Sequence, residues 1–232
     1  MRRGEVVVET RDLAMYFGGV KAVDRVDFTL RDRELRCLIG PNGAGKSTFF
    51  KCLTGQLRPT AGDVVIRDTP VTGFESHAIA ALGVGIKTQV PNVFDGLSVG
   101  ENLWLSARRW HGAKQSDALV AELLERLFLG AIKGALVGTL AHGQRQWVEL
   151  GMVMAAEPWL VLLDEPAAGM TAEETARTAD LILEINRTAT VVVVEHDMAF
   201  IRMISQVVTL FHEGRILMED TMDAISRDAR AR

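Results

Sequence analysis

The sequence has few cysteines and no long apolar run. Only two of its 232 residues are cysteine, Cys37 and Cys52, and both lie in apolar stretches. A disulfide framework is therefore not expected, and a reducing compartment is the simplest expected location for the chain. No stretch reaches the roughly 18 consecutive apolar residues that indicate a membrane-spanning helix. We therefore expect any work at a membrane to go through a separate partner.

A charge excess of one sign and a secretion leader are also missing. The formal net charge is -4, with 48% hydrophobic and 24% charged residues, which is an ordinary globular composition. This balance gives no reason to expect nucleic acid as a partner. The first five residues, MRRGE, lack the apolar run of a signal peptide, so we do not expect an exported protein.

Short β-branched runs alternate with helical patterns along the chain. The runs cover residues 6–8, 35–39, 160–163 and 191–194. Continuous apolar runs of this length are typical of strands covered on both faces. Thr171 and Glu174 have the spacing of a capping box, and apolar residues follow at helical intervals up to Ile185. The alternation predicts an α/β fold with a largely parallel core sheet.

The middle third of the chain carries a different pattern. Between about residues 99 and 150, leucines at helical spacing replace the strand signals. We interpret this stretch as an inserted helical subdomain of about residues 91–154. The core then comprises about residues 1–90 and 155–232 of a single domain that spans residues 1–232. From Asp220 onward we expect a short helix and a polar tail.

One segment fits the complete P-loop pattern between a predicted strand and a predicted helix. Its residues are Gly40, Pro41, Asn42, Gly43, Ala44, Gly45, Lys46, Ser47 and Thr48. Glycines let such a loop wrap tightly, so backbone N–H groups point at phosphates, and the helix N-terminus adds partial positive charge. Lys46 is expected to reach the β- and γ-phosphates and Ser47 to bind Mg²⁺, which makes ATP and Mg²⁺ the expected cofactors.

Two acids follow the apolar run at residues 160–163. Asp164 at the carboxyl end of a strand can hold the Mg²⁺ shell, and Glu165 can orient or deprotonate an attacking water. Pro166 then ends the strand. Adjacent acids are common on surfaces, so this pair becomes informative only behind a buried run and together with a P-loop.

A third segment resembles the signature loop of ABC ATPases, whose commonest form is Leu-Ser-Gly-Gly-Gln. Its residues are Leu140, Ala141, His142, Gly143 and Gln144. The order of P-loop, Gln89, this loop, Asp164-Glu165 and His196 is also the order of that family. The resemblance covers essentially the whole chain. It implies a P-loop NTPase (RecA-like) α/β core with an antiparallel β subdomain and an inserted helical subdomain.

The resemblance also implies roles for single residues. Gln89 resembles the Q-loop glutamine, which would contact Mg²⁺ or its water; the alternative is a polar residue that ends a strand. His196 resembles the switch histidine that contacts the γ-phosphate and would act with Lys46 and Glu165 in catalysis. Phe17 resembles the aromatic residue that stacks on adenine, with Tyr16 as the alternative. Residues 167–170 depart from the family's usual Ser-Ala-Leu-Asp D-loop.

The resemblance implies the ATPase subunit of an importer. It would form a homodimer, or a heterodimer with a second ABC ATPase, in which each signature loop contacts the other subunit's ATP in a C₂ arrangement. Transmembrane permease subunits, and indirectly a solute-binding protein, would be its partners. The chain would then be cytoplasmic and peripheral on the inner face of the cell membrane.

The transported solute is inferred from local similarity alone. The segments that resemble the ATPases of urea and branched-chain amino-acid importers, with the urea type closer, are residues 34–39, the loop at residues 140–144 with Trp147 downstream, and residues 168–171. A soluble ABC ATPase of translation or repair is a competing hypothesis, but such proteins usually carry two ATPase halves or long coiled insertions. The presence of Lys46, Asp164, Glu165 and His196 argues against a third hypothesis, a catalytically silent subunit.

Overall fold

Two β-sheets organise the chain in the computed structural model, which describes residues 4–228. The larger sheet has six strands in the order β10-β9-β3-β8-β7-β6, and the smaller has four in the order β2-β1-β4-β5. The strands are β1 (Val6–Phe17), β2 (Val20–Arg31), β3 (Leu35–Ile39), β4 (Ala61–Ile66), β5 (Thr69–Pro70), β6 (Val84–Lys87), β7 (Leu160–Asp164), β8 (Thr190–Val194), β9 (Val207–His212) and β10 (Arg215–Asp220).

The six-stranded sheet confirms the predicted parallel α/β core. Every residue of β3, β7 and β8 is buried, as their continuous apolar runs predicted. These strands pair in parallel with each other and with β6 and β9, and only the edge strand β10 is antiparallel. Alternate side chains serve two cores: Cys37 packs with the cluster beneath the helices, and Leu38 with the cluster beneath the antiparallel sheet.

The run at residues 6–8 does not belong to the core sheet. It begins β1, which pairs antiparallel with β2 and β4 in the smaller sheet. Val7 and Val8 are buried, but Val6 is 40% exposed. A three-residue β-branched run is too short to distinguish a strand covered on both faces from one that is covered on one side, and here that prediction was wrong.

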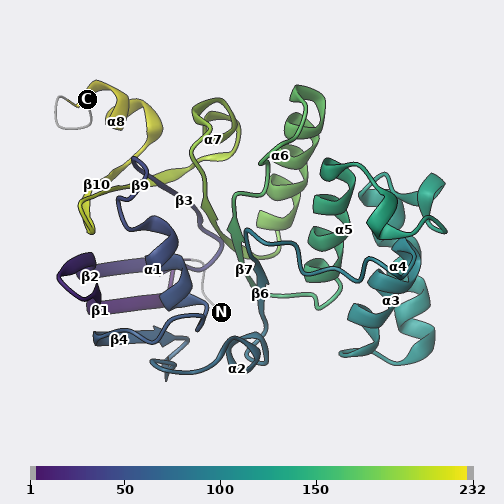
Figure 1. Cartoon of the computed structure of the whole chain (residues 1–232), viewed down its shortest axis with the longest axis horizontal. Coiled ribbons are helices and arrows are strands. Elements are labelled where there is room, and N and C mark those ends of the chain that lie inside the picture. Colours follow the sequence, from purple (N-terminus) through teal and green to yellow (C-terminus); the bar gives the residue numbers. More distant parts are fainter. Residues whose placement is uncertain (1–3, 229–232) are drawn as a thin grey trace.

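Helices cover the core sheet, and some of them form one end of the molecule (Figure 1). They are α1 (Lys46–Leu53), α2 (Ser76–Ala80), α3 (Val99–Arg108), α4 (Ala113–Arg126), α5 (His142–Met154), α6 (Ala172–Asn186), α7 (Met198–Ile204) and α8 (Met222–Arg227), with short 3₁₀ turns at Gly130–Ile132 and Val137–Thr139. Helices α3, α4 and α5 pack together at the end of the molecule opposite the antiparallel sheet (Figure 1).

Two sequence signals correspond to observed helix boundaries. Thr171 caps α6 by accepting a hydrogen bond from the Glu174 amide, and the Glu174 carboxylate accepts one from the Thr171 amide. The helix expected after Asp220 is α8, and the predicted polar tail falls mostly on residues 229–232, outside the described part of the chain. Among residues 4–228, no helix is long and apolar enough to cross a membrane.

Candidate functional site

The P-loop leaves the carboxyl end of β3 and leads directly into α1. Gly40 has φ 143° and Gly45 has φ 102°, values that favour glycine. A Cβ atom would clash with the carbonyl oxygen of Phe211 at the first position and with that of Ala22 at the second. The second contact brings β2 of the antiparallel sheet against the P-loop. Both glycines are therefore needed for the close approach of neighbouring backbone.

Lys46 is held inside this loop. Its Nζ donates hydrogen bonds to the carbonyl oxygens of Gly40 at 2.7 Å and Pro41 at 3.0 Å. Burial lowers the pKa of Lys46, whereas the charges of Glu165 and then Asp164 act to raise it. The ammonium group therefore lies in the field of both acids that follow β7.

Asp164 and Glu165 differ sharply in their surroundings. Asp164 ends β7 and is 3% exposed. Burial, followed by the charge of Glu165, raises the pKa of Asp164 to about 6. Glu165 is only partly buried and has φ 48°, a strained conformation for a non-glycine residue. The buried carboxylate would thus be stabilised by a cation.

The donor set fits Mg²⁺ that is bound together with phosphate. The described residues hold no group of three or more His, Cys, Asp or Glu side chains able to bind a metal ion. Mg²⁺, however, usually takes one or two protein oxygen ligands plus phosphate and water. Ser47 is exposed at the start of α1, and the buried carboxylate of Asp164 supplies the negative charge.

Three predicted residues meet at the carboxyl edge of the core sheet. Gln89 Nε2 donates a hydrogen bond of 3.2 Å to Glu165 Oε2. His196 Nδ1 lies 3.3 Å from Glu165 Oε1. These residues follow β6, β7 and β8, which are neighbours in the sheet. Gln89 lies two residues beyond β6, and its side chain contacts Glu165.

The two candidate adenine-binding aromatics are placed differently. Tyr16 donates its hydroxyl hydrogen to Asp24 Oδ1 at 3.0 Å, and this bond raises the pKa of the Tyr16 phenol. Phe17, at the end of β1, is 48% exposed. The phenol is therefore engaged within the antiparallel sheet, and the Phe17 ring is accessible to a ligand.

The signature loop lies apart from this constellation within the single chain. Ala141 is the N-cap of α5 and has no side-chain cap hydrogen bond, while its amide donates to Gln144 Oε1 at 3.3 Å. His142 packs against Gly169, the third residue of the D-loop, and Gly143 packs against the Glu174 carboxylate. Figure 1 shows α5 and α1 on different sides of the core sheet. Ala141 and His142 are exposed.

Sequence reasoning missed Glu195, a buried acid that precedes His196. One of its oxygens accepts from the Ala167 amide at 3.3 Å, and the other accepts from the amides of His196 at 2.8 Å and Asp197 at 3.3 Å. Glu195 thus links the Ala167 amide to the backbone amides of His196 and Asp197. An acid directly after the apolar run at residues 191–194 was the available signal.

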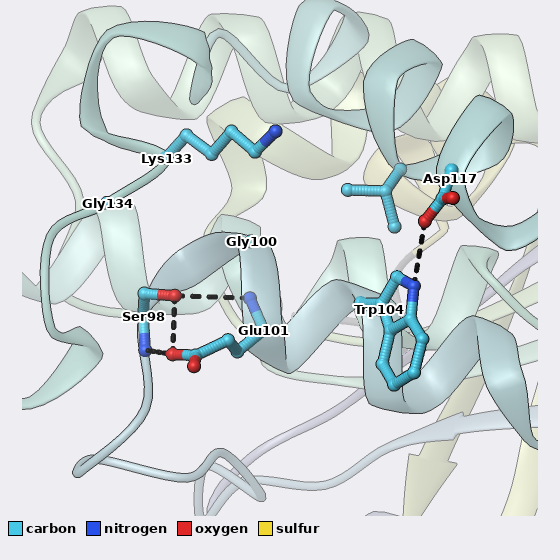
Figure 2. A pocket seen from close by; sticks show the side chains of 8 residues that line it. Ser98, Gly100, Glu101, Trp104, Asp117, Lys133 and Gly134 are labelled. Atoms are coloured by element: carbon cyan, nitrogen blue, oxygen red, sulfur yellow. Dashed lines mark hydrogen bonds between the residues drawn. The ribbon is translucent and has the colours of Figure 1, made fainter. Parts of the chain in front are cut away.

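A pocket of about 500 Å³ lies among α3, α4 and the turn at Lys133 (Figure 2), and Glu165 is not among its lining residues. Its polar side chains largely pair with each other. Trp104 Nε1 donates to Asp117 at 2.9 Å, and the Ser98 hydroxyl donates to Glu101 at 2.6 Å. The pocket therefore lacks the convergent polar groups of the P-loop region.

Comparisons with known proteins agree with this geometry. The family model described as ABC transporter matches residues 23–168. The LivG high-affinity branched-chain amino acid transport ATP-binding protein of Salmonella typhimurium is 35% identical over 231 residues, with 92% of this chain and 91% of the relative covered. The corresponding BraF protein of Pseudomonas aeruginosa is 31% identical over 237 residues and covers 94% and 93%.

The fold is shared with solved structures as well. A nucleotide-free ATP-binding cassette from an ABC transporter superposes with a TM-score of 0.86 at 24% identity and covers 97% of both chains. The P-loop, Gln89, the signature loop and the acid pair all lie inside the matched residues 23–168. The chain therefore belongs to the ABC transporter family.

Proposed function

We propose that the chain binds ATP with Mg²⁺ and hydrolyses it. The observation that carries this proposal is the Glu165 carboxylate, held between Gln89 and His196 beside the P-loop. Glu165 orients or deprotonates the attacking water, and His196 contacts the γ-phosphate. Lys46 leaves its two carbonyl partners to bind the β- and γ-phosphates.

The remaining site residues bind the nucleotide. Ser47 and Asp164 would hold Mg²⁺, with Gln89 on the ion or its water, and the ion would neutralise phosphate charge. The amides of residues 40–48 would bind phosphate oxygens, and the accessible ring of Phe17 would stack on adenine. Tyr16 is less suited to this role because its hydroxyl is bonded to Asp24.

We infer that two ATPase chains must meet to complete the site. The signature loop, residues 140–144, exposes Ala141 and His142 and precedes a helix on the other side of the core sheet from α1. It would contact ATP on the opposite subunit. The α5 N-terminus and the Gly143 amide supply the phosphate-binding groups there. The partner is a second copy of the chain or a different ABC ATPase.

The proposed assembly is an importer with separate membrane permeases and a solute-binding protein. The two relatives named above are branched-chain amino acid transport proteins, and the chain spans over nine tenths of each. These relatives favour a branched-chain amino acid as the solute over urea, the solute that local sequence similarity had placed first.

Two assays test the proposal. Purified chain should hydrolyse ATP in the presence of Mg²⁺, alone or with its permeases. A strain that lacks the gene should lose high-affinity uptake of labelled leucine, isoleucine or valine, and regain it with the wild-type gene but not with Lys46→Ala. Loss of urea uptake with normal amino-acid uptake would favour urea as the transported solute. Normal uptake of both would overturn the importer assignment.

A further inference from the structure

A buried ion pair lies beneath the segment that carries Gln89. Lys87 is the last residue of β6 and Glu149 lies in the middle of α5, and their side chains are 1% and 3% exposed. Lys87 Nζ is 3.4 Å from Glu149 Oε2. Neither of these atoms has a hydrogen-bond partner among the described residues. The pair is outside the set of residues that the proposed reaction uses.

Folding stability is a poor explanation for this pair. Burial raises the pKa of Glu149 despite the opposing charge of Lys87, which reflects the cost of burying the carboxylate. Replacing a buried ion pair with well-packed apolar residues often leaves a protein equally or more stable. The two unsatisfied atoms add to that cost. A role in positioning is a better account of why these charges lie here.

Glu149 contacts the chain on both sides of Gln89. We define the Q-loop as residues 88–92. Glu149 Oε1 accepts a hydrogen bond of 3.0 Å from the Asn92 amide, three residues after Gln89. Glu149 Oε2 faces Lys87, two residues before Gln89. One carboxylate on α5 therefore contacts Lys87, directly before the Q-loop, and Asn92, the last residue of the Q-loop.

The same helix begins at the signature loop. Helix α5 starts at His142, so a shift of Glu149 along or around the helix moves the signature loop with it. Lys87 also pairs with Leu163, the neighbour of Asp164, and its charge opposes the burial that raises the pKa of Asp164. The pair thus lies between the acid that ends β7 and the helix that carries residues 142–144.

We propose that Glu149 and Lys87 are positioning residues that lock the Q-loop to α5, so that movement of Gln89 on nucleotide binding is passed to the signature loop. The inference rests on the proposed function for the role of Gln89. It concerns chain movement on ATP binding, however, and not hydrolysis or transport.

Three variants of the full-length chain separate the contacts. Lys87→Met with Glu149→Gln removes both charges but keeps an acceptor oxygen for the Asn92 amide. Lys87→Met with Glu149→Leu removes the acceptor as well. Asn92→Pro removes the donor and leaves the buried pair intact, which provides a second route if the leucine variant does not fold. Arg36→Met with Glu34→Gln removes another ion pair of the core sheet and serves as the control.

Amide hydrogen exchange of the nucleotide-free proteins is the first measurement. The leucine double variant should exchange at least tenfold faster over residues 88–92 than the parent. Asn92→Pro, which has no amide hydrogen at position 92, should do so over residues 88–90. The glutamine double variant, which keeps the Asn92 bond but loses the ion pair, should exchange faster than the parent by a smaller factor. The Arg36 control should remain within about threefold of the parent there. Unchanged exchange in both the leucine double variant and Asn92→Pro would overturn the proposal. Equal acceleration throughout β6, β7 and α5 would overturn it too.

The second measurement adds ATP and Mg²⁺. In the parent, nucleotide should change exchange over residues 140–147, and in the leucine double variant or Asn92→Pro this change should vanish while the ATP Kd stays within about threefold. A parent without the change, or a variant that retains it, would contradict the proposal. A parent that shows the change but hydrolyses no ATP would remove the proposed function and leave this inference in place.

Discussion

Glu165 Oε2 accepts a hydrogen bond of 3.2 Å from Gln89 Nε2, across two neighbouring strands of the core sheet. His196 Nδ1 lies 3.3 Å from the other oxygen of the same carboxylate. Glu165, which makes both contacts, has φ 48°, a strained conformation for a non-glycine residue. An amide and an imidazole thus fix the carboxylate that we assign to the attacking water.

Phe17→Ala should weaken ATP binding. Loss of one base-stacking aromatic costs roughly 1–3 kcal/mol, so Kd should rise at least about fivefold. Tyr16→Phe should keep Kd within about threefold, because the Tyr16 hydroxyl bonds to Asp24 within the protein. Titration with a fluorescent ATP analogue measures both. The reverse ranking would assign adenine stacking to Tyr16.

Ala141→Ser tests the unusual signature loop. Ala141 is the N-cap of α5, and serine there would supply the missing cap, which is worth about 0.5–2 kcal/mol of stability. The hydroxyl could also donate to the γ-phosphate, but the Gly143 amide and the helix terminus are already present. We expect higher stability in urea and less than about a tenfold change in turnover. A hundredfold rise would show that the native loop is impaired.

Asp164→Asn should stabilise the nucleotide-free chain while impairing Mg²⁺-dependent ATP binding. Because the folded-state pKa of Asp164 is raised to about 6, its ionised form opposes folding above that pH. The gain should be about 1–3 kcal/mol at pH 7.5 and should shrink as pH falls from about 6 toward 4, where the parent carboxyl is neutral too. Urea unfolding at pH 7.5 and pH 5 checks the sign. A destabilised variant at pH 7.5 would contradict it.

Trp147→Phe should destabilise the packing between α5 and α6. Trp147 Nε1 donates a hydrogen bond of 2.9 Å to Thr178 Oγ1, and both residues are buried. We expect a loss of about 1–3 kcal/mol in the free energy of unfolding. Trp104→Phe is the matched control, because its Nε1 bond to Asp117 is exposed and should cost less than about 0.5 kcal/mol. Equal losses for the two variants would argue against a structural role for this bond.

Local patterns predicted the parallel core and the placement of the site at its carboxyl edge. The P-loop and the acids after β7 are contiguous motifs, and parallel neighbouring strands end at the same edge. Lys87, Glu149 and Glu195 were not predicted, because their importance comes from burial and from partners distant in sequence. The run at residues 6–8 was misassigned because it carries no information on which sheet it joins.

The transported solute could not be predicted from these residues either. Trp147 and the Ala141-His142 pair lie in and beside the signature loop, where nucleotide chemistry, and not a solute, is expected. Similarity in this region therefore compares ATPases and not their cargo.

The most direct test of the central claim is ATP turnover by Glu165→Gln, measured together with its oligomeric state by size-exclusion chromatography and light scattering. The variant keeps the size of Glu165 but removes its charge, so hydrolysis should fall by a factor on the order of 10²–10⁴. ATP should still bind through Lys46 and Ser47, and the closed dimer should accumulate, whereas Lys46→Ala should prevent both. A Glu165→Gln protein that binds ATP, stays monomeric and hydrolyses it at the parent rate would contradict the account.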